Sequence, residues 1–176
     1  YISLYPNSPN AAYASYLIGL SYYLLIPNIG RDQEFSMKSL EQFQILIKRY
    51  PNSEYVNDAK LKMDLTYDHL AGEEMEIGRY YLKKDLFIAA INRFKAVVTG
   101  YQTTIHIEEA LARLVESYMA LGIISEAQTA AAILGYNYPG SEWYKDSYNL
   151  LQSGGLSPKE DTNSWISKTW RSVNPI

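Results

Sequence analysis

The chain has 176 residues, of which 47% are hydrophobic and 20% charged, and its formal net charge is −3. No run of sequence approaches the roughly 18 apolar residues that a membrane span requires, and the absence of cysteine excludes disulfides, thiol catalysis and cysteine-ligated zinc. Because the sequence contains no block of basic residues, we expect no nucleic-acid partner.

The first predicted hairpin covers residues 9–52. Its helices, over 10–25 and 35–49, are joined by an inserted loop at 26–33, where Pro, Asn and Gly favour turns. Each helix has one apolar stripe at helical spacing. The stripe residues are Ile18, Gly19 and Tyr22 in the first helix and Phe43 and Leu46 in the second.

The next helix is predicted to be unusually long, from residue 53 to residue 83. Ser53 is placed to cap its start. Gly72 is unfavourable inside a helix, by about 1 kcal/mol relative to Ala. Strong helix formers follow directly at 73–76, so we expect one continuous helix rather than two short ones.

This long helix and its successor form the central hairpin, which turns at residues 83–85. The small residues Gly78 and Ala90 let the two helices approach closely, and the rings of Tyr81 and Phe94 fill the remaining space. This arrangement of small and large residues is typical of a tetratricopeptide (TPR) hairpin.

The same pattern recurs further along the chain. Tyr118 repeats the role of Tyr81, and Ala127 that of Ala90. A Tyr-Pro end signal, in which proline stops one helix and serine caps the next, also recurs. It is found at residues 5–8, 50–53 and 138–141, with a variant that lacks proline at 101–104.

We therefore predict an all-α, TPR-type solenoid of antiparallel helical hairpins, because a single hairpin cannot bury both of its faces. The expected units are 9–52, 53–103 and 104–140, followed by a capping helix at 141–152. Residues 1–8 are expected to be the end of a preceding, truncated repeat.

Residues 153–176 are predicted to be a linker and a C-terminal tail. Ser, Gly and Pro dominate its start, and Trp165, Ile166 and Trp170 then recur at helical spacing. Three interpretations remain open. The tail folds back on the repeats, its tryptophans anchor a partner or an interface, or it is disordered.

The sequence predicts no enzyme, cofactor or metal site. His69 and Glu73 are spaced i, i+4 on a helix, but no full ligand set lies near them in the sequence. His106 precedes two carboxylates at a helix start, where the helix dipole alone accounts for them. No phosphate loop or nucleophile elbow is present.

The 17 tyrosines are the unusual feature of the composition. Tyr13, Tyr16, Tyr23 and Tyr80 have two interpretations. They line the inner, concave face of the solenoid and contact an extended peptide or partner, or they pack between repeats.

Three segments carry a resemblance to a known family: IKRYPNSEYVNDAK (47–60), EIGRYYLKKDLFIAAINRFKAVVTGYQTT (76–104) and EEALARLVESYMALG (108–122). Together with the inserted loop that ends in Gly30-Arg31-Asp32, they resemble the BamD family, also called ComL or YfiO. The resemblance covers about residues 1–135. The sequence departs from the family at Tyr101-Gln102, where Tyr-Pro is usual, and in its tryptophan-bearing tail.

The resemblance implies a lipoprotein at the periplasmic face of the Gram-negative outer membrane, in the machinery that inserts β-barrel proteins. It implies that the chain is the C-terminal part of a five-unit TPR protein, with the lipidated cysteine upstream. Expected partners are BamA-like POTRA domains, other lipoproteins of the machinery, and unfolded outer-membrane clients, which the family binds mainly through its N-terminal repeats. The family's POTRA-docking arginine corresponds to Arg93. The alternative is a TPR module that binds an extended peptide in its concave groove.

Overall fold

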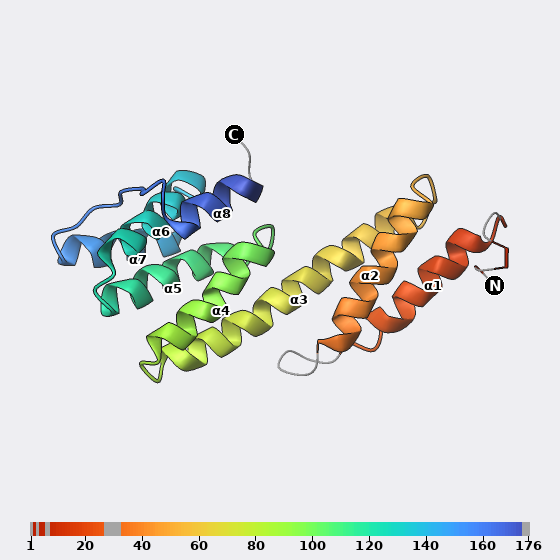
Figure 1. Ribbon diagram of the computed structural model, residues 1–176, viewed down its shortest axis with the longest axis horizontal. Coiled ribbons are helices and arrows are strands. Elements are labelled where there is room, and N and C mark those ends of the chain that lie inside the picture. Colours follow the sequence, from red (N-terminus) through yellow and green to blue (C-terminus); the bar gives the residue numbers. More distant parts are fainter. Residues whose placement is uncertain (1, 3, 6–7, 27–32, 174–176) are drawn as a thin grey trace. The chain divides into compact units, whose positions relative to one another are not determined.

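The computed structural model describes residues 2, 4, 5, 8–26 and 33–173 (Figure 1). Within these residues every regular element is a helix and none is a strand, which confirms the all-α prediction. Most of the predicted inserted loop and part of the 5–8 end signal lie outside the described residues. The helices are α1 (Ala11–Tyr23), α2 (Glu34–Arg49), α3 (Val56–Leu82), α4 (Phe87–Gly100), α5 (Ile107–Ala120), α6 (Ile124–Asn137), α7 (Glu142–Ser153) and α8 (Trp165–Val173).

Helix α3 runs without interruption for 27 residues, so the prediction of one long helix across Gly72 is confirmed. It begins at Val56, three residues later than predicted. The Ser53 side chain accepts a hydrogen bond from the backbone N–H of Tyr55 at 3.3 Å, and the Ser53 carbonyl accepts one from Val56. Ser53 therefore closes a turn in front of the helix.

The corners after α3 and α5 have the same construction, as a repeat requires. Asp85 and Gly122 both adopt a left-handed backbone, with φ of 57° and 72°. The next N–H in each case reaches back to the preceding helix, from Leu86 to the Tyr81 carbonyl at 3.0 Å and from Ile123 to the Tyr118 carbonyl at 2.9 Å. This is the Schellman type of helix end.

The described helices fall into two units, Tyr1–Leu70 and Ala71–Ile176. In the first, α1 packs against α2, and the start of α3 completes a small core around Phe43, Leu46 and Ala59. The helices approach closely at Gly19, where an added Cβ would lie 2.6 Å from the Phe43 ring. The predicted stripe of small and large residues is thus the packing surface.

The second unit contains a larger core, built on α4, α5 and α6 and extended by α7 and α8. A Cβ at Gly78 would lie 2.5 Å from the Phe94 ring, so the predicted small-against-large contact joins α3 to α4. Gly135 on α6 makes the same kind of close contact, because a Cβ there would lie 2.3 Å from the Tyr144 ring on α7.

The C-terminal tail folds back onto the second unit, which is one of the three predicted alternatives. Its linker runs along α6, where Gln128 donates to the Ser157 carbonyl at 2.8 Å and the Asp161 N–H donates to Thr129 Oγ1 at 3.0 Å. Helix α8 then contacts α4 and α6 and buries Ile166 and Trp170.

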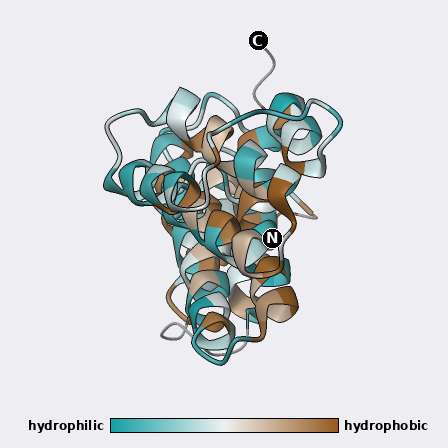
Figure 2. Ribbon diagram, turned by 90° about the vertical axis from the view of Figure 1, so that its left-hand side faces the viewer, coloured by the Kyte–Doolittle hydropathy of each residue, from teal (hydrophilic) through white to brown (hydrophobic). Residues whose placement is uncertain are grey.

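Hydrophobic and hydrophilic residues alternate along the helices, as the banded colours of Figure 2 show. This banding is expected of helices that bury one face and leave the other in water. None of the helices in the described part of the chain combines the length and the apolar character needed to cross a membrane.

Candidate functional site

Arg93 lies on α4 beside the C-terminal part of α3. Its Nη1 donates to the Glu74 carboxylate, at 3.2 Å to Oε2 and 3.4 Å to Oε1, and 41% of the Arg93 side chain is exposed. The two residues border a hollow of about 320 Å³. It is lined by Glu74, Tyr81, Ala89, Asn92, Arg93 and Ala96.

Arg93 has a partner within the chain and donors left over for a second one. Glu74, only 14% exposed, holds the guanidinium from one side, so the intramolecular partner exists. Among the described residues the side-chain hydrogen bonds of Arg93 use Nη1 alone. A guanidinium has five N–H donors, so the others remain available to a second carboxylate supplied by a partner. A role of Arg93 in docking stays a prediction.

Three of the four singled-out tyrosines come together in the first unit. The rings of Tyr13 and Tyr16 lie 5.3 Å and 5.1 Å from the ring of Tyr55. Tyr16 donates its hydroxyl hydrogen bond to Asp58 Oδ2 at 2.5 Å, and the Lys62 ammonium lies over the Tyr23 ring at 5.7 Å. Tyr80, on α3 in the second unit, packs edge-on against Tyr81 instead.

The Asp58 carboxylate is the polar centre of this tyrosine cluster. Hydrogen bonds from Lys62, at 2.7 and 2.8 Å, and from Tyr16 lower the pKa of Asp58. Burial, together with the bond to Asp58, raises the pKa of the Tyr16 hydroxyl. Asp58 is charged and Tyr16 is protonated near neutral pH, and the two shifts widen the pH range over which the hydrogen bond that joins α1 to α3 persists.

The four tyrosines differ in how much of each side chain is exposed. Tyr16 and Tyr23 are half-buried by the contacts that hold α1 on α3. Tyr13 is 45% exposed and Tyr80 is 59% exposed, so their rings are accessible within their own units. Contact of these tyrosines with a peptide or partner stays a prediction.

The two tail tryptophans lie against the chain itself. Trp170 is buried and packs edge-on against Tyr138 at 6.4 Å. Trp165 donates its indole N–H to the Tyr118 hydroxyl at 2.9 Å, and the Lys95 ammonium lies 4.6 Å from the Trp165 ring centre. Intramolecular packing therefore accounts for both residues, and a further role as a partner anchor stays a prediction.

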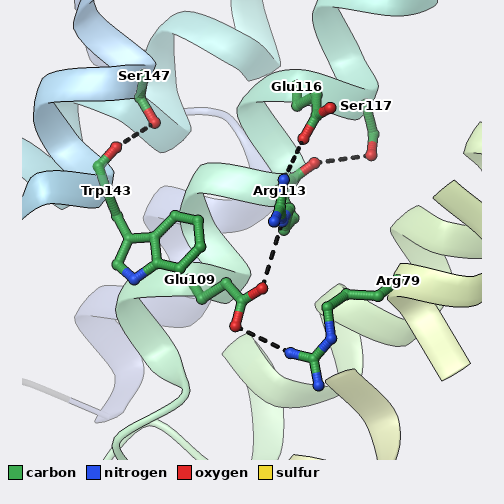
Figure 3. A network of polar contacts seen from close by, with 7 residues as sticks. All are labelled: Arg79, Glu109, Arg113, Glu116, Ser117, Trp143 and Ser147. Atoms are coloured by element: carbon green, nitrogen blue, oxygen red, sulfur yellow. Dashed lines mark hydrogen bonds and ion pairs between the residues drawn. The ribbon is translucent and has the colours of Figure 1, made fainter. Parts of the chain in front are cut away.

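A polar network on α3 and α5 is not among the features predicted from the sequence (Figure 3). Arg79 donates to the Glu109 carboxylate at 2.9 Å. Arg113 donates to the same carboxylate at 3.3 Å and to the Glu116 carboxylate at 2.8 Å. The Arg113 guanidinium also lies 5.1 Å from the ring centre of Trp143 on α7. The i, i+4 spacing of Glu109 and Arg113 was a visible signal, whereas the contacts between helices were not.

Metal binding was weighed from the sequence at His69 and Glu73. Within the described ranges, no three His, Asp or Glu side chains lie close enough together to hold a metal ion. Glu73, the suggested partner of His69, is a buried residue of α3.

Comparison with known proteins places these features in a family context. Residues 1–133 match the YfiO family, described as outer membrane lipoproteins. The chain is 50% identical to the outer membrane protein assembly factor BamD of Caulobacter vibrioides over 158 residues, which are 90% of this chain and 52% of that protein.

Two further relatives bear the same name. The protein of Rickettsia prowazekii is 51% identical over 153 residues, 87% of this chain and 61% of its own length. The protein of Neisseria meningitidis serogroup A is 35% identical over 148 residues, 78% of this chain and 55% of its own length. The chain thus spans between half and two thirds of the length of these relatives.

Proposed function

Because the chain belongs to the YfiO family of outer membrane lipoproteins, we propose that it acts as a non-catalytic scaffold in outer membrane protein assembly. The observation that carries this proposal is the 50% identity to a named assembly factor over 90% of the chain. The relatives' names describe an assembly factor and not an enzyme, in keeping with our prediction of a non-catalytic protein.

The finer proposal concerns where and with what the scaffold works. It would act at the periplasmic face of the outer membrane, anchored through lipid in the full-length protein, and it would dock on BamA-like POTRA domains through Arg93. The hollow beside Arg93 supports this, because a half-exposed guanidinium with free donors suits a carboxylate of a partner. Other assembly lipoproteins and unfolded clients are further proposed partners.

The docking proposal is tested by reversing the charge of Arg93. We expect Arg93→Glu to weaken binding of the chain to purified POTRA domains more than tenfold, because truncating one partner of a buried charge pair at an interface costs about 2–5 kcal/mol. Isothermal titration calorimetry measures the affinity. Lys84→Glu makes the same charge change at an exposed residue of the neighbouring corner and should leave the affinity unchanged.

The carboxylate that Arg93→Glu introduces would face Glu74, so the fold must be checked separately. Circular dichroism should show unchanged helicity, and Arg93→Ala, which adds no repulsion, should also weaken binding. If both variants are folded and bind POTRA domains as the original chain does, the docking role of Arg93 is wrong.

A second candidate function is binding of an extended peptide to the tyrosine cluster. The exposed ring of Tyr13, backed by Tyr55 and Tyr16, favours it. Titration with unfolded outer-membrane peptides, followed by NMR, should shift resonances of residues 13, 16 and 55 and leave those around Arg93 in place. The absence of such shifts would exclude this second function.

A further inference from the structure

A second hollow lies within the second unit, between α5 and α7. Its volume is about 210 Å³, below the roughly 300–1,000 Å³ of most small-molecule sites. It therefore has room for one or two side chains rather than for a cofactor. It is lined by Ala112, Arg113, Glu116, Trp143, Asp146, Ser147 and Leu150.

The cation in this hollow is already engaged. Arg113 bonds to Glu109 at 3.3 Å and to Glu116 at 2.8 Å, and it lies against the Trp143 ring. Figure 3 shows the guanidinium held between the two carboxylates. Arg113 therefore leaves little positive charge for an anionic ligand.

Negative charge, in contrast, is left over at the rim. The Glu116 side chain is 45% exposed although it pairs with Arg113. Asp146 is exposed, and in the part of the chain that the structure describes its carboxylate makes no hydrogen bond or ion pair. Arg113 pairs with Glu116 and shares Glu109 with Arg79, so the carboxylate of Asp146 is left without a cation at the opening.

Apart from Ser147, whose hydroxyl donates to the Trp143 carbonyl, the remaining residues that line the hollow are apolar. Trp143 is only half-buried and Leu150 is exposed, while Ala112 is buried. An aromatic ring beside carboxylates is suited to a long basic side chain, whose methylene groups cover the ring while its charged end reaches the acidic oxygens.

We propose that this hollow binds an arginine or lysine side chain of an extended segment of a partner protein, flanked there by apolar residues. The cationic group would lie between Glu116 and Asp146, and the aliphatic stem would lie on Trp143 and Leu150. This surface selects the opposite charge from the hollow at Arg93, and the inference does not rest on the proposed docking there.

The test uses the full 176-residue chain and three acetylated, amidated pentapeptides, Ala-Leu-Arg-Leu-Ala and its glutamate and citrulline counterparts. We expect the arginine peptide to shift the Trp143 indole N–H and the backbone resonances of residues 113, 116 and 146 in ¹⁵N NMR spectra. The citrulline peptide, which has the same shape without the charge, should bind at least fivefold more weakly, and the glutamate peptide should not bind.

A charge reversal and its matched control locate the contact. Asp146→Lys should weaken binding of the arginine peptide at least tenfold. Glu142 lies on the same helix but does not line the hollow, and 82% of its side chain is exposed. Glu142→Lys should therefore leave the affinity for the arginine peptide unchanged. Both positions are exposed, so both variants should retain their helicity.

Three results would overturn the inference: an Asp146→Lys variant that binds as the original chain does, equal binding of all three peptides, or shifts confined to residues outside the hollow. POTRA binding of Asp146→Lys, measured in parallel, separates this surface from the one at Arg93.

Discussion

Single glycines decide how closely neighbouring helices pack in both units. Gly19 and Gly78 leave room for Phe43 and Phe94, whose rings are fully buried and cannot move aside. The missing Cβ at these positions is therefore a requirement of the fold, although glycine is a poor helix former.

We expect Gly78→Ala to lower the free energy of unfolding by about 1–3 kcal/mol, because the new methyl group would overlap the Phe94 ring. Urea denaturation followed by circular dichroism measures it. Gly100→Ala is the matched control, since nothing lies within 4 Å of its added Cβ, and it should be neutral or slightly stabilising. Equal stability of the two variants would contradict the packing role of Gly78.

Contacts that follow a repeated spacing could be predicted from the sequence, whereas contacts between helices without such a spacing could not. Gly78, Phe94 and their repeats are periodic, so the pattern alone predicted their contact. Arg113 and Trp143 meet across two helices at no fixed spacing. Their contact depends on how α7 packs on α5, and nothing local in the sequence encodes that arrangement.

Helix α8 shows the same limit at the scale of an element. Trp165, Ile166 and Trp170 recur in the sequence at helical spacing, and the structure contains a helix there. Its burial against α4 and α6 remained one alternative of three, because periodicity identifies an apolar face but not the surface that covers it.

The packing of α8 predicts that the tail stabilises the second unit. Ile166 is fully buried, so Ile166→Ala should lower the free energy of unfolding by about 2–5 kcal/mol. Lys168→Ala, at an exposed position of the same helix, should change it by less than about 0.5 kcal/mol. Urea denaturation compares the two, and an Ile166→Ala variant as stable as Lys168→Ala would show that the tail does not hold its place in solution.

At the scale of the whole molecule, the two units have separate cores of different size. The core of the first unit centres on Phe43, Leu46 and Ala59, whereas that of the second extends through α4 to α8. In repeat proteins stability is approximately local, so the two cores need not open together.

We therefore expect Phe43→Ala to act on one unit. Loss of this buried ring should lower the free energy of unfolding of the first unit by about 3–5 kcal/mol. The rate of amide hydrogen exchange in that unit should then rise roughly a hundredfold or more. Hydrogen–deuterium exchange should accelerate in α1 and α2 and remain slow in α5 and α6. A uniform acceleration along the whole chain would show instead that both units unfold as one.

All three tryptophans, Trp143, Trp165 and Trp170, belong to the second unit, whereas tyrosines are found in both. Excitation at the red edge of the protein absorption spectrum, where only indole absorbs, therefore reports on the second unit and not on the first. The chain thus carries a built-in optical label, and a comparison of indole emission with total ellipticity distinguishes the melting of its two halves without any chemical modification.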